Sequence, residues 1–94
     1  MKTIHRFTLE PVDKDGFVTI QLPSWADGGC SILHVETLLN MPMIWVLLDT
    51  NAKRVPWLFK LVRTGEDAEN CHEHTYIGTV IVDNQSVHIF QGVR

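Results

Sequence analysis

Residues 51–63 hold four of the eight cationic side chains of this chain, together with a tryptophan. The cations are Lys53, Arg54, Lys60 and Arg63, and the aromatic residue is Trp57. Guanidinium and ammonium groups bind phosphate oxygens, and an indole can stack on a planar base. The segment therefore predicts a site for a small nucleotide-like anion. The alternative is a solvated hairpin whose charges protect a sheet edge from aggregation, with the indole in the core.

The sequence "CHEH" at residues 71–74 combines a thiol, two imidazoles and a carboxylate, which are zinc ligand types. Adjacent residues of an extended chain point to opposite sides, so His72 and His74 can converge, or Cys71 and Glu73, but not all four. No C-x-x-C pair completes a tetrahedral set. The pattern favours a polar loop leading into a strand. We therefore predict no metal and no cofactor, and a zinc-supported domain stays an alternative.

Catalytic motifs are missing from the sequence. It contains no Gly-rich phosphate loop, dinucleotide fingerprint or metalloprotease motif. Cys71 cannot form a thiolate–imidazolium pair with His72 through adjacency alone. His34 and His88 fall in apolar segments, where we expect half-exposed or hydrogen-bonded histidines. The sequence thus predicts binding and not catalysis, so the protein is not expected to be an enzyme.

Composition narrows the classes of partner. The 94 residues are the size of one domain, and 45% hydrophobic with 20% charged residues is typical of a globular chain. A net charge of −3 argues against duplex DNA or RNA, since phosphate neutralisation drives that binding. No apolar run approaches the roughly 20 residues that span a bilayer, and the first residues lack a secretion signal. We predict a single domain, 1–94, that is cytoplasmic, with Cys30 and Cys71 as free thiols.

The elements that position these residues are predicted to be β-strands, because apolar residues alternate or form short runs between turn signals. Such a series of short strands predicts a small antiparallel sandwich or partly open barrel. The predicted core includes two strand residues, Leu33 and Val35. The seven predicted strands cover residues 2–10, 17–22, 30–39, 43–49, 57–63, 75–82 and 87–90.

Three predicted strand segments, 43–49, 57–62 and 76–82, carry apolar residues at both parities. A two-layer domain buries only one face of each strand in its own core. In the run "MIWVLL", the surplus face is therefore either Ile44, Val46 and Leu48 or Trp45 and Leu47. We predict that this face serves a homo-oligomer, and the alternative is a rolled barrel or long loop that covers it within one chain.

Several short motifs follow one another in a characteristic order along nearly the whole chain. They are Val18–Pro23, Ile32–Val35, Pro42–Asp49, Thr64–Gly65 and Tyr76–Thr79. In this order they resemble a family of small proteins that is frequent in tailed-bacteriophage genomes and classed as a domain of unknown function. The chain departs from the family pattern at "SWADGGC" and "EDAENCHE", and the resemblance assigns no catalytic residues.

The resemblance implies a phage origin. Small non-enzymatic phage proteins often antagonise host immunity, either by sequestering a nucleotide signal or by masking a host protein. We therefore predict a counter-defence protein of the host cytoplasm that holds a nucleotide-type signal through the four cations of residues 51–63, with Trp57 or Trp25 stacking on the base. The alternative is a protein-binding module that masks a host or virion protein.

Overall fold

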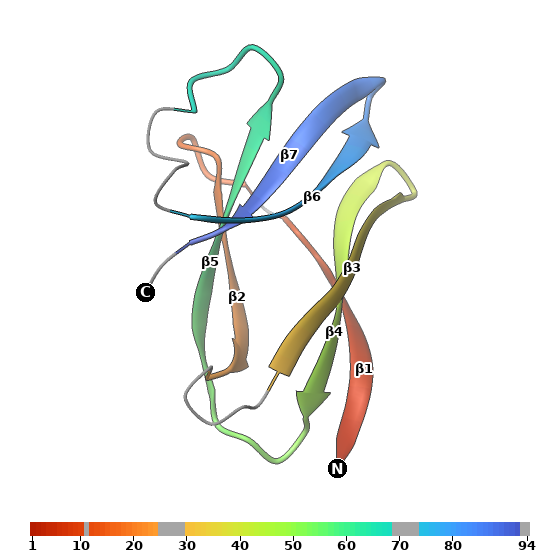
Figure 1. Ribbon diagram of the computed structural model, residues 1–94, viewed down its shortest axis with the longest axis vertical. Helices are drawn as coiled ribbons and strands as arrows, with labels where there is room; N and C mark the ends of the chain where they lie inside the picture. The colour runs from red at the N-terminus through yellow and green to blue at the C-terminus, as the bar shows by residue number, and fades with distance from the viewer. Residues whose placement is uncertain (11, 25–29, 69–73, 93–94) are drawn as a thin grey trace.

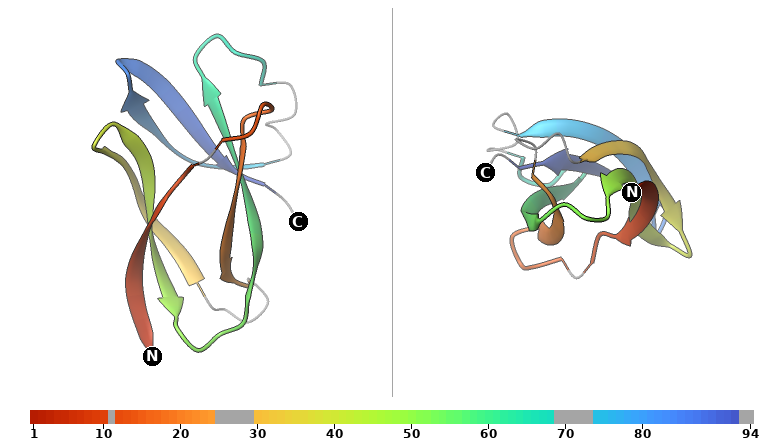
Figure 2. Two further views of the ribbon diagram at one scale, coloured as in Figure 1. Left: turned by 180° about the vertical axis from the view of Figure 1, so that it is seen from behind. Right: turned by 90° about the horizontal axis from the view of Figure 1, so that it is seen from below.

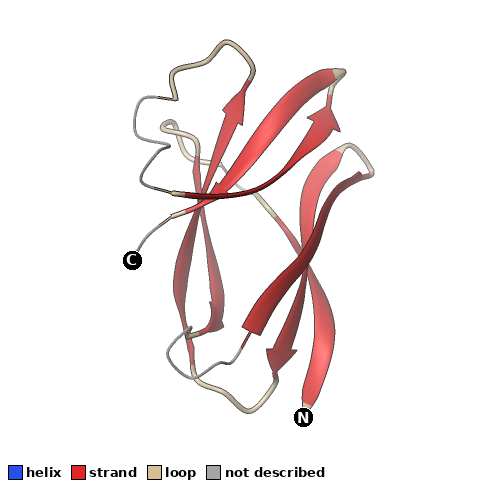
Figure 3. Cartoon of the chain, in the orientation of Figure 1, coloured by secondary structure: helices blue, strands red, loops and turns tan. Residues whose placement is uncertain are grey.

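The computed structural model describes residues 1–10, 12–24, 30–68 and 74–92, and within them it contains seven β-strands and no helix (Figures 1 and 3). All strand pairs are antiparallel, in a three-stranded sheet of order β1-β4-β3 and a four-stranded sheet of order β2-β5-β7-β6. The sheets do not close into a barrel, so the predicted sandwich is confirmed. The strands are β1 (Lys2–Thr8), β2 (Phe17–Pro23), β3 (Cys30–Leu38), β4 (Met41–Asp49), β5 (Arg54–Arg63), β6 (Thr75–Val82) and β7 (Gln85–Gln91).

The hydrophobic core lies between the inner faces of the two sheets. Alternation along β4 places Ile44, Val46 and Leu48 in the core, fully or almost fully buried, whereas Trp45 and Leu47 lie on the opposite face of the strand. The inner face of β5 contributes Phe59, which is completely buried. The core of the sandwich therefore uses the even-numbered residues of "MIWVLL", and Trp45 and Leu47 are the surplus face.

The two sheets meet where β3 lies against β6 (Figure 1). Gly78 of β6 allows this close approach, because a Cβ atom at this position would lie 2.2 Å from a methyl carbon of Val35. The hydroxyl of Thr37 also donates a hydrogen bond to the carbonyl of Ile81. On the other side, the connection from β1 to β2 crosses from one sheet to the other (Figure 2).

Both tight hairpins turn through two residues with positive φ. Leu39 and Asn40 join β3 to β4 with φ of 53° and 61°, and Asp83 and Asn84 join β6 to β7 with φ of 53° and 62°. Two such residues in succession define the type I′ turn that matches the twist of a hairpin. The predicted closing hairpin is confirmed, and its tip is bonded to the other one, since the amide of Asn40 donates to Asp83 Oδ1 at 2.6 Å.

The prediction that Leu33 belongs to the core is wrong. Leu33 is 50% exposed, because the pairing of β3 with β4 shifts by one residue between Ile32 and His34. Such a bulge adds a residue that has no partner opposite and changes which side chains face inward. Val35, beyond the bulge, packs against the core as predicted.

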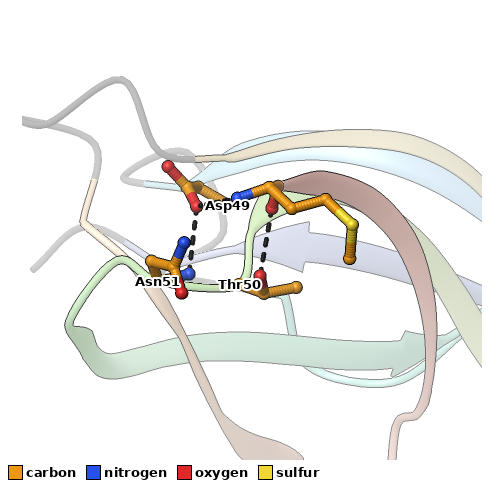
Figure 4. Close-up of polar contacts among 4 residues, drawn as sticks. Asp49, Thr50 and Asn51 are labelled. Atoms are coloured by element: carbon orange, nitrogen blue, oxygen red, sulfur yellow. Dashed lines mark hydrogen bonds and ion pairs between the residues drawn. The ribbon is translucent and has the colours of Figure 1, made fainter.

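Met1, the residue before β1, is bonded to the end of β4 and the loop that follows it (Figure 4). The backbone N–H and hydroxyl of Thr50 donate to the Met1 carbonyl at 2.8 and 3.1 Å. The carboxylate of Asp49 accepts the backbone N–H of Asn51 at 3.0 Å and lies 3.3 Å from the Met1 amino group. These contacts lower the pKa of Asp49 below its ordinary value, with the Asn51 hydrogen bond the largest cause.

Candidate functional site

The structure does not bring the four predicted cations together. Arg54 and Arg63 are the two ends of β5, so about 30 Å of extended strand separates them. Lys53 lies beside Arg54 at one end, and Lys60 lies near Arg63 at the other. A small anion can therefore meet at most one of these two pairs.

Trp57 belongs to the core and not to a surface site. It is 3% exposed, its ring stacks on Phe59 with centroids 6.5 Å apart, and its indole N–H donates to the Pro23 carbonyl at 3.1 Å. A ligand outside the sandwich has no access to the faces of this ring. Trp25, the other predicted stacking residue, lies outside the described residues, as do Cys71 and His72.

A row of four paired residues crosses the outer face of the four-stranded sheet, one from each strand. Phe17 of β2 pairs with Lys60 of β5, which pairs with Phe90 of β7, which pairs with Tyr76 of β6. The Lys60 ammonium lies 4.5 Å from the centroid of the Phe17 ring, and the rings of Tyr76 and Phe90 meet edge to face at 5.5 Å. We call these four residues the aromatic row. It presents three π-systems with one cation among them.

The aromatic row is accessible from solvent. Tyr76 is 55% exposed, and the other three members are partly exposed. They lie on the outer face because Val18 and Phe59, their neighbours along β2 and β5, face the core. An exposed aromatic surface beside a cation is the equipment that proteins use to stack planar bases.

The turn between β1 and β2 holds Lys60 in place. The Lys60 ammonium donates to the Asp15 carbonyl at 2.7 Å. Asp13 Oδ1 accepts the backbone N–H groups of Phe17 and Asp15, each at 2.9 Å, and these bonds lower its pKa below the ordinary value with help from the charge of Lys60. Gly16 completes the turn with φ of +86°, where a Cβ would meet the Leu61 carbonyl at 2.9 Å.

A polar group borders the aromatic row at His88. Its two ring nitrogens are hydrogen-bonded to the hydroxyls of Thr64 at 2.8 Å and Thr79 at 3.0 Å, and a hydrogen bond also joins Thr79 to the Tyr76 hydroxyl. The prediction of a hydrogen-bonded histidine is confirmed. These contacts hold the phenol ring of the row in position. The ring of His74 flanks the other end, 6.2 Å from that of Phe17.

A cleft of about 610 Å³ opens next to Lys60, between the β1–β2 connection, the end of β5 and the β6–β7 hairpin. Its volume is within the usual range for small-molecule sites. Its apolar lining includes Leu61, Val82 and Val87. Carboxylates outnumber cations in the lining: they are Glu10, Asp13, Asp15, Glu66 and Asp67, against Lys14, Lys60 and Arg63. The cleft alone is therefore a poor site for a phosphate.

The described residues offer neither a metal site nor a membrane-spanning helix. Within residues 1–10, 12–24, 30–68 and 74–92, no group of three or more His, Cys, Asp or Glu side chains is placed to hold a metal ion. Of the "CHEH" cluster, this part of the chain includes His74 alone. The same residues contain no helix long and apolar enough to cross a bilayer.

The fold and the surface define a small antiparallel β-sandwich with an exposed aromatic row. Residues 1–94 match the family model described as "Domain of unknown function (DUF7352)", and the chain belongs to this family. The expected membership of a family of unknown function is confirmed. Comparison with curated proteins and with solved structures found no significant match.

Lys60 is a candidate residue in the sequence analysis, but the three rings around it are not named there. Phe17, Tyr76 and Phe90 lie 16 to 43 residues from Lys60 in sequence, and only the strand register brings the four together. The sequence nevertheless contained a signal that two of these rings could face outward. Phe17 and Phe90 stand next to Val18 and Ile89, and in such a pair one residue must face outward.

Proposed function

We propose that this protein is a non-catalytic binding protein that sequesters a small nucleotide-type ligand on the outer face of its four-stranded sheet. The observation that carries this proposal is the aromatic row, in which Lys60 stands between Phe17 and Phe90 in direct register. Stacking on such rings contributes about 1 to 3 kcal/mol per base and tolerates any base. A lysine at the same place supplies the charge that a phosphate requires.

The position of Lys60 supports this role. An ammonium group has three N–H donors, and the Asp15 carbonyl takes one of them, which leaves two that can point to a ligand oxygen. The same bond restricts the side chain before a ligand arrives, so less conformational entropy is lost on binding. Lys60 is thus a preorganised anion contact on the outer face.

The motif order that resembles tailed-phage proteins supports a phage origin and a counter-defence role in the host cytoplasm. A protein that removes an immune signal by stoichiometric binding needs affinity but no general base or nucleophile. Its capacity is then set by the number of protein molecules made during infection.

The test is calorimetric titration of the protein with a panel of mononucleotides, dinucleotides and cyclic oligonucleotides. Lys60→Met is expected to weaken binding at least about tenfold, equivalent to ~1.4 kcal/mol, and Phe90→Ala by a similar factor. Arg54→Ala is the matched control, since Arg54 lies on the same strand and the same face about 20 Å from Lys60. It is expected to change affinity less than twofold, roughly 0.4 kcal/mol.

Two results would contradict the proposed function. One is that no member of the panel binds to the folded protein. The other is a binding member whose affinity is unchanged in both Lys60→Met and Phe90→Ala, with thermal unfolding showing that the variants are folded.

A second candidate, a module that masks another protein, is favoured by Leu39. This residue is 82% exposed at a hairpin tip with φ of 53°, where leucine is disfavoured and asparagine or glycine is usual. The fold itself does not explain a leucine at this position, whereas insertion of its side chain into an apolar pocket of a partner would explain it. Affinity capture from infected cells with wild type and Leu39→Asn tests this idea. A partner retained equally by both would remove its support.

A further inference from the structure

The outer face of the three-stranded sheet is apolar at its centre. Leu47 and Trp45 lie on this face of β4, and Ile4 of β1 pairs with Leu47 and is 54% exposed. The ring of His34, from β3, covers part of Trp45 with centroids 5.5 Å apart. A central apolar strand flanked by an exposed isoleucine is the kind of surface that a macromolecular partner covers.

Around Trp45 the charges on this face are separated to its two sides, while Asp49, at the end of β4, lies 3.3 Å from the Met1 amino group. Arg6 of β1 is exposed and pairs with Trp45 from one side. On the other side β3 carries Glu36, whose carboxylate lies 2.9 Å from the imidazole of His34. The face therefore has a cationic edge, an apolar centre and an acidic edge.

Such an arrangement is complementary to itself. A twofold rotation about an axis parallel to β4 places β1 of one copy over β3 of the other. Arg6 then faces His34 of the second copy, and Glu36 lies two residues along the same strand, within the reach of an arginine side chain. Trp45 and Leu47 of the two copies meet at the centre. A twofold axis perpendicular to β4 would instead put β1 of one copy over β1 of the other and bring like charges together.

We propose that the protein forms a twofold homodimer through the outer face of its three-stranded sheet, with Arg6 of each copy paired with Glu36 of the other. Sheets that pack face to face in this way cross at about 30° because of their twist. The aromatic rows then lie on the two far sides of the dimer, so this inference is independent of the proposed function.

The test is sedimentation equilibrium over a wide concentration range. Wild type is expected to dimerise, and Leu47→Asp is expected to weaken dimerisation at least about tenfold because it places a charge at the centre of the interface. Thr19→Asp, on the exposed outer face of β2, is the matched control and should dimerise like wild type. A wild type that stays monomeric at millimolar concentration, or Leu47→Asp that dimerises like wild type, would overturn the inference.

A charge exchange tests the orientation of the two copies. Arg6→Glu and Glu36→Arg should each weaken the dimer, since each change affects two symmetric pairs. The double variant restores opposite charges across the interface and should recover most of the wild-type affinity. All three alter exposed side chains, so circular dichroism should show the same fold. A double variant that dimerises no better than either single one would rule out the proposed pairing.

Discussion

The two outer faces of the sandwich differ in where they place their charges. On the three-stranded sheet, Arg6 and Glu36 lie on opposite sides of an apolar centre. On the four-stranded sheet Lys60 lies among aromatic rings, in the middle of the aromatic row. Charges at the edges suit a large surface that must be oriented, whereas a central charge suits a small anion with a planar ring. The same fold thus offers two surfaces with different chemical partners.

This difference comes from the central strands and from their neighbours, since Lys60 belongs to β5, whereas Arg6 and Glu36 belong to β1 and β3. Both β4 and β5 are apolar at both parities, and each has one face in the core. On β4 the outer face receives Ile4 and His34 from its neighbours, and on β5 it receives Phe17 and Phe90. Comparison of the two sheets shows that a surface cannot be assigned from one strand alone.

The assignment of Trp57 to the core and of Tyr76 to the exposed face can be tested by their effects on stability. Trp57→Ala is expected to lower the free energy of unfolding by about 3 to 5 kcal/mol, because it removes a buried ring and its hydrogen bond to Pro23. Tyr76→Ala, in the exposed aromatic row, should lower it by less than about 1.5 kcal/mol. Urea unfolding measures both. If the two losses were similar, the division between core and binding face would be wrong.

The contact that holds the two sheets together is the next test. Gly78→Ala is expected to lower the free energy of unfolding by about 1 to 3 kcal/mol, since the new methyl group clashes with Val35. Val35→Ala removes the clashing methyl, so the double variant should lose less than the sum of the two single changes. Chemical denaturation of the four proteins completes the cycle. Strict additivity would show that β3 and β6 do not touch at this point.

The two hairpin tips provide a comparison within the fold itself. Leu39→Asn is expected to raise the free energy of unfolding by about 0.5 to 1 kcal/mol, because asparagine tolerates the left-handed conformation that leucine resists. Asp83→Leu makes the reverse change in the other hairpin and also loses the bond to Asn40. Asp83→Leu should therefore lower the free energy of unfolding. Thermal unfolding of both variants shows whether Leu39 is retained at the expense of stability.

The smallest effect concerns acid stability. The pKa values of Asp13 and Asp49 are lowered in the folded protein, so the stability each adds is present above the ordinary value of 3.8 and is lost as pH falls through the lower folded value. Asp13→Asn keeps an oxygen acceptor for the backbone of Phe17 but cannot be protonated in this range. The free energy of unfolding of Asp13→Asn should therefore fall less steeply than that of wild type as the pH drops below 3.8, as measured by urea unfolding. An identical slope would contradict the assignment.

Asp13 lies in the connection between β1 and β2, and Asp49→Asn is the counterpart at the end of β4. It should also flatten the acid dependence, and a double variant should flatten it more than either single one. If one of the two variants leaves the slope unchanged, the pKa of that aspartate is not lowered in the folded protein.

The sequence was sufficient to predict the strands but not the site. Alternation and turn residues are local signals, so all seven strands and the closing hairpin could be found from them. The position of Trp57 could not, because both faces of its strand are apolar and either can be the inner one. Leu33 was misplaced by a bulge that leaves no local mark. The aromatic row depends on the register of four strands, which only the folded sheet defines.

The order of strand pairing has a consequence for synthesis on the ribosome. β1 pairs with β4, and β2 pairs with β5, so both strands that emerge first must await partners that come later. At about 5 to 20 residues per second, the roughly 40 residues from one partner to the next take ~2 to 8 s. During this interval Phe7, Val18 and Leu22 have no sheet to cover them. The nascent chain is therefore exposed to chaperones until the β3–β4 hairpin, which can form from local contacts alone, provides the first template.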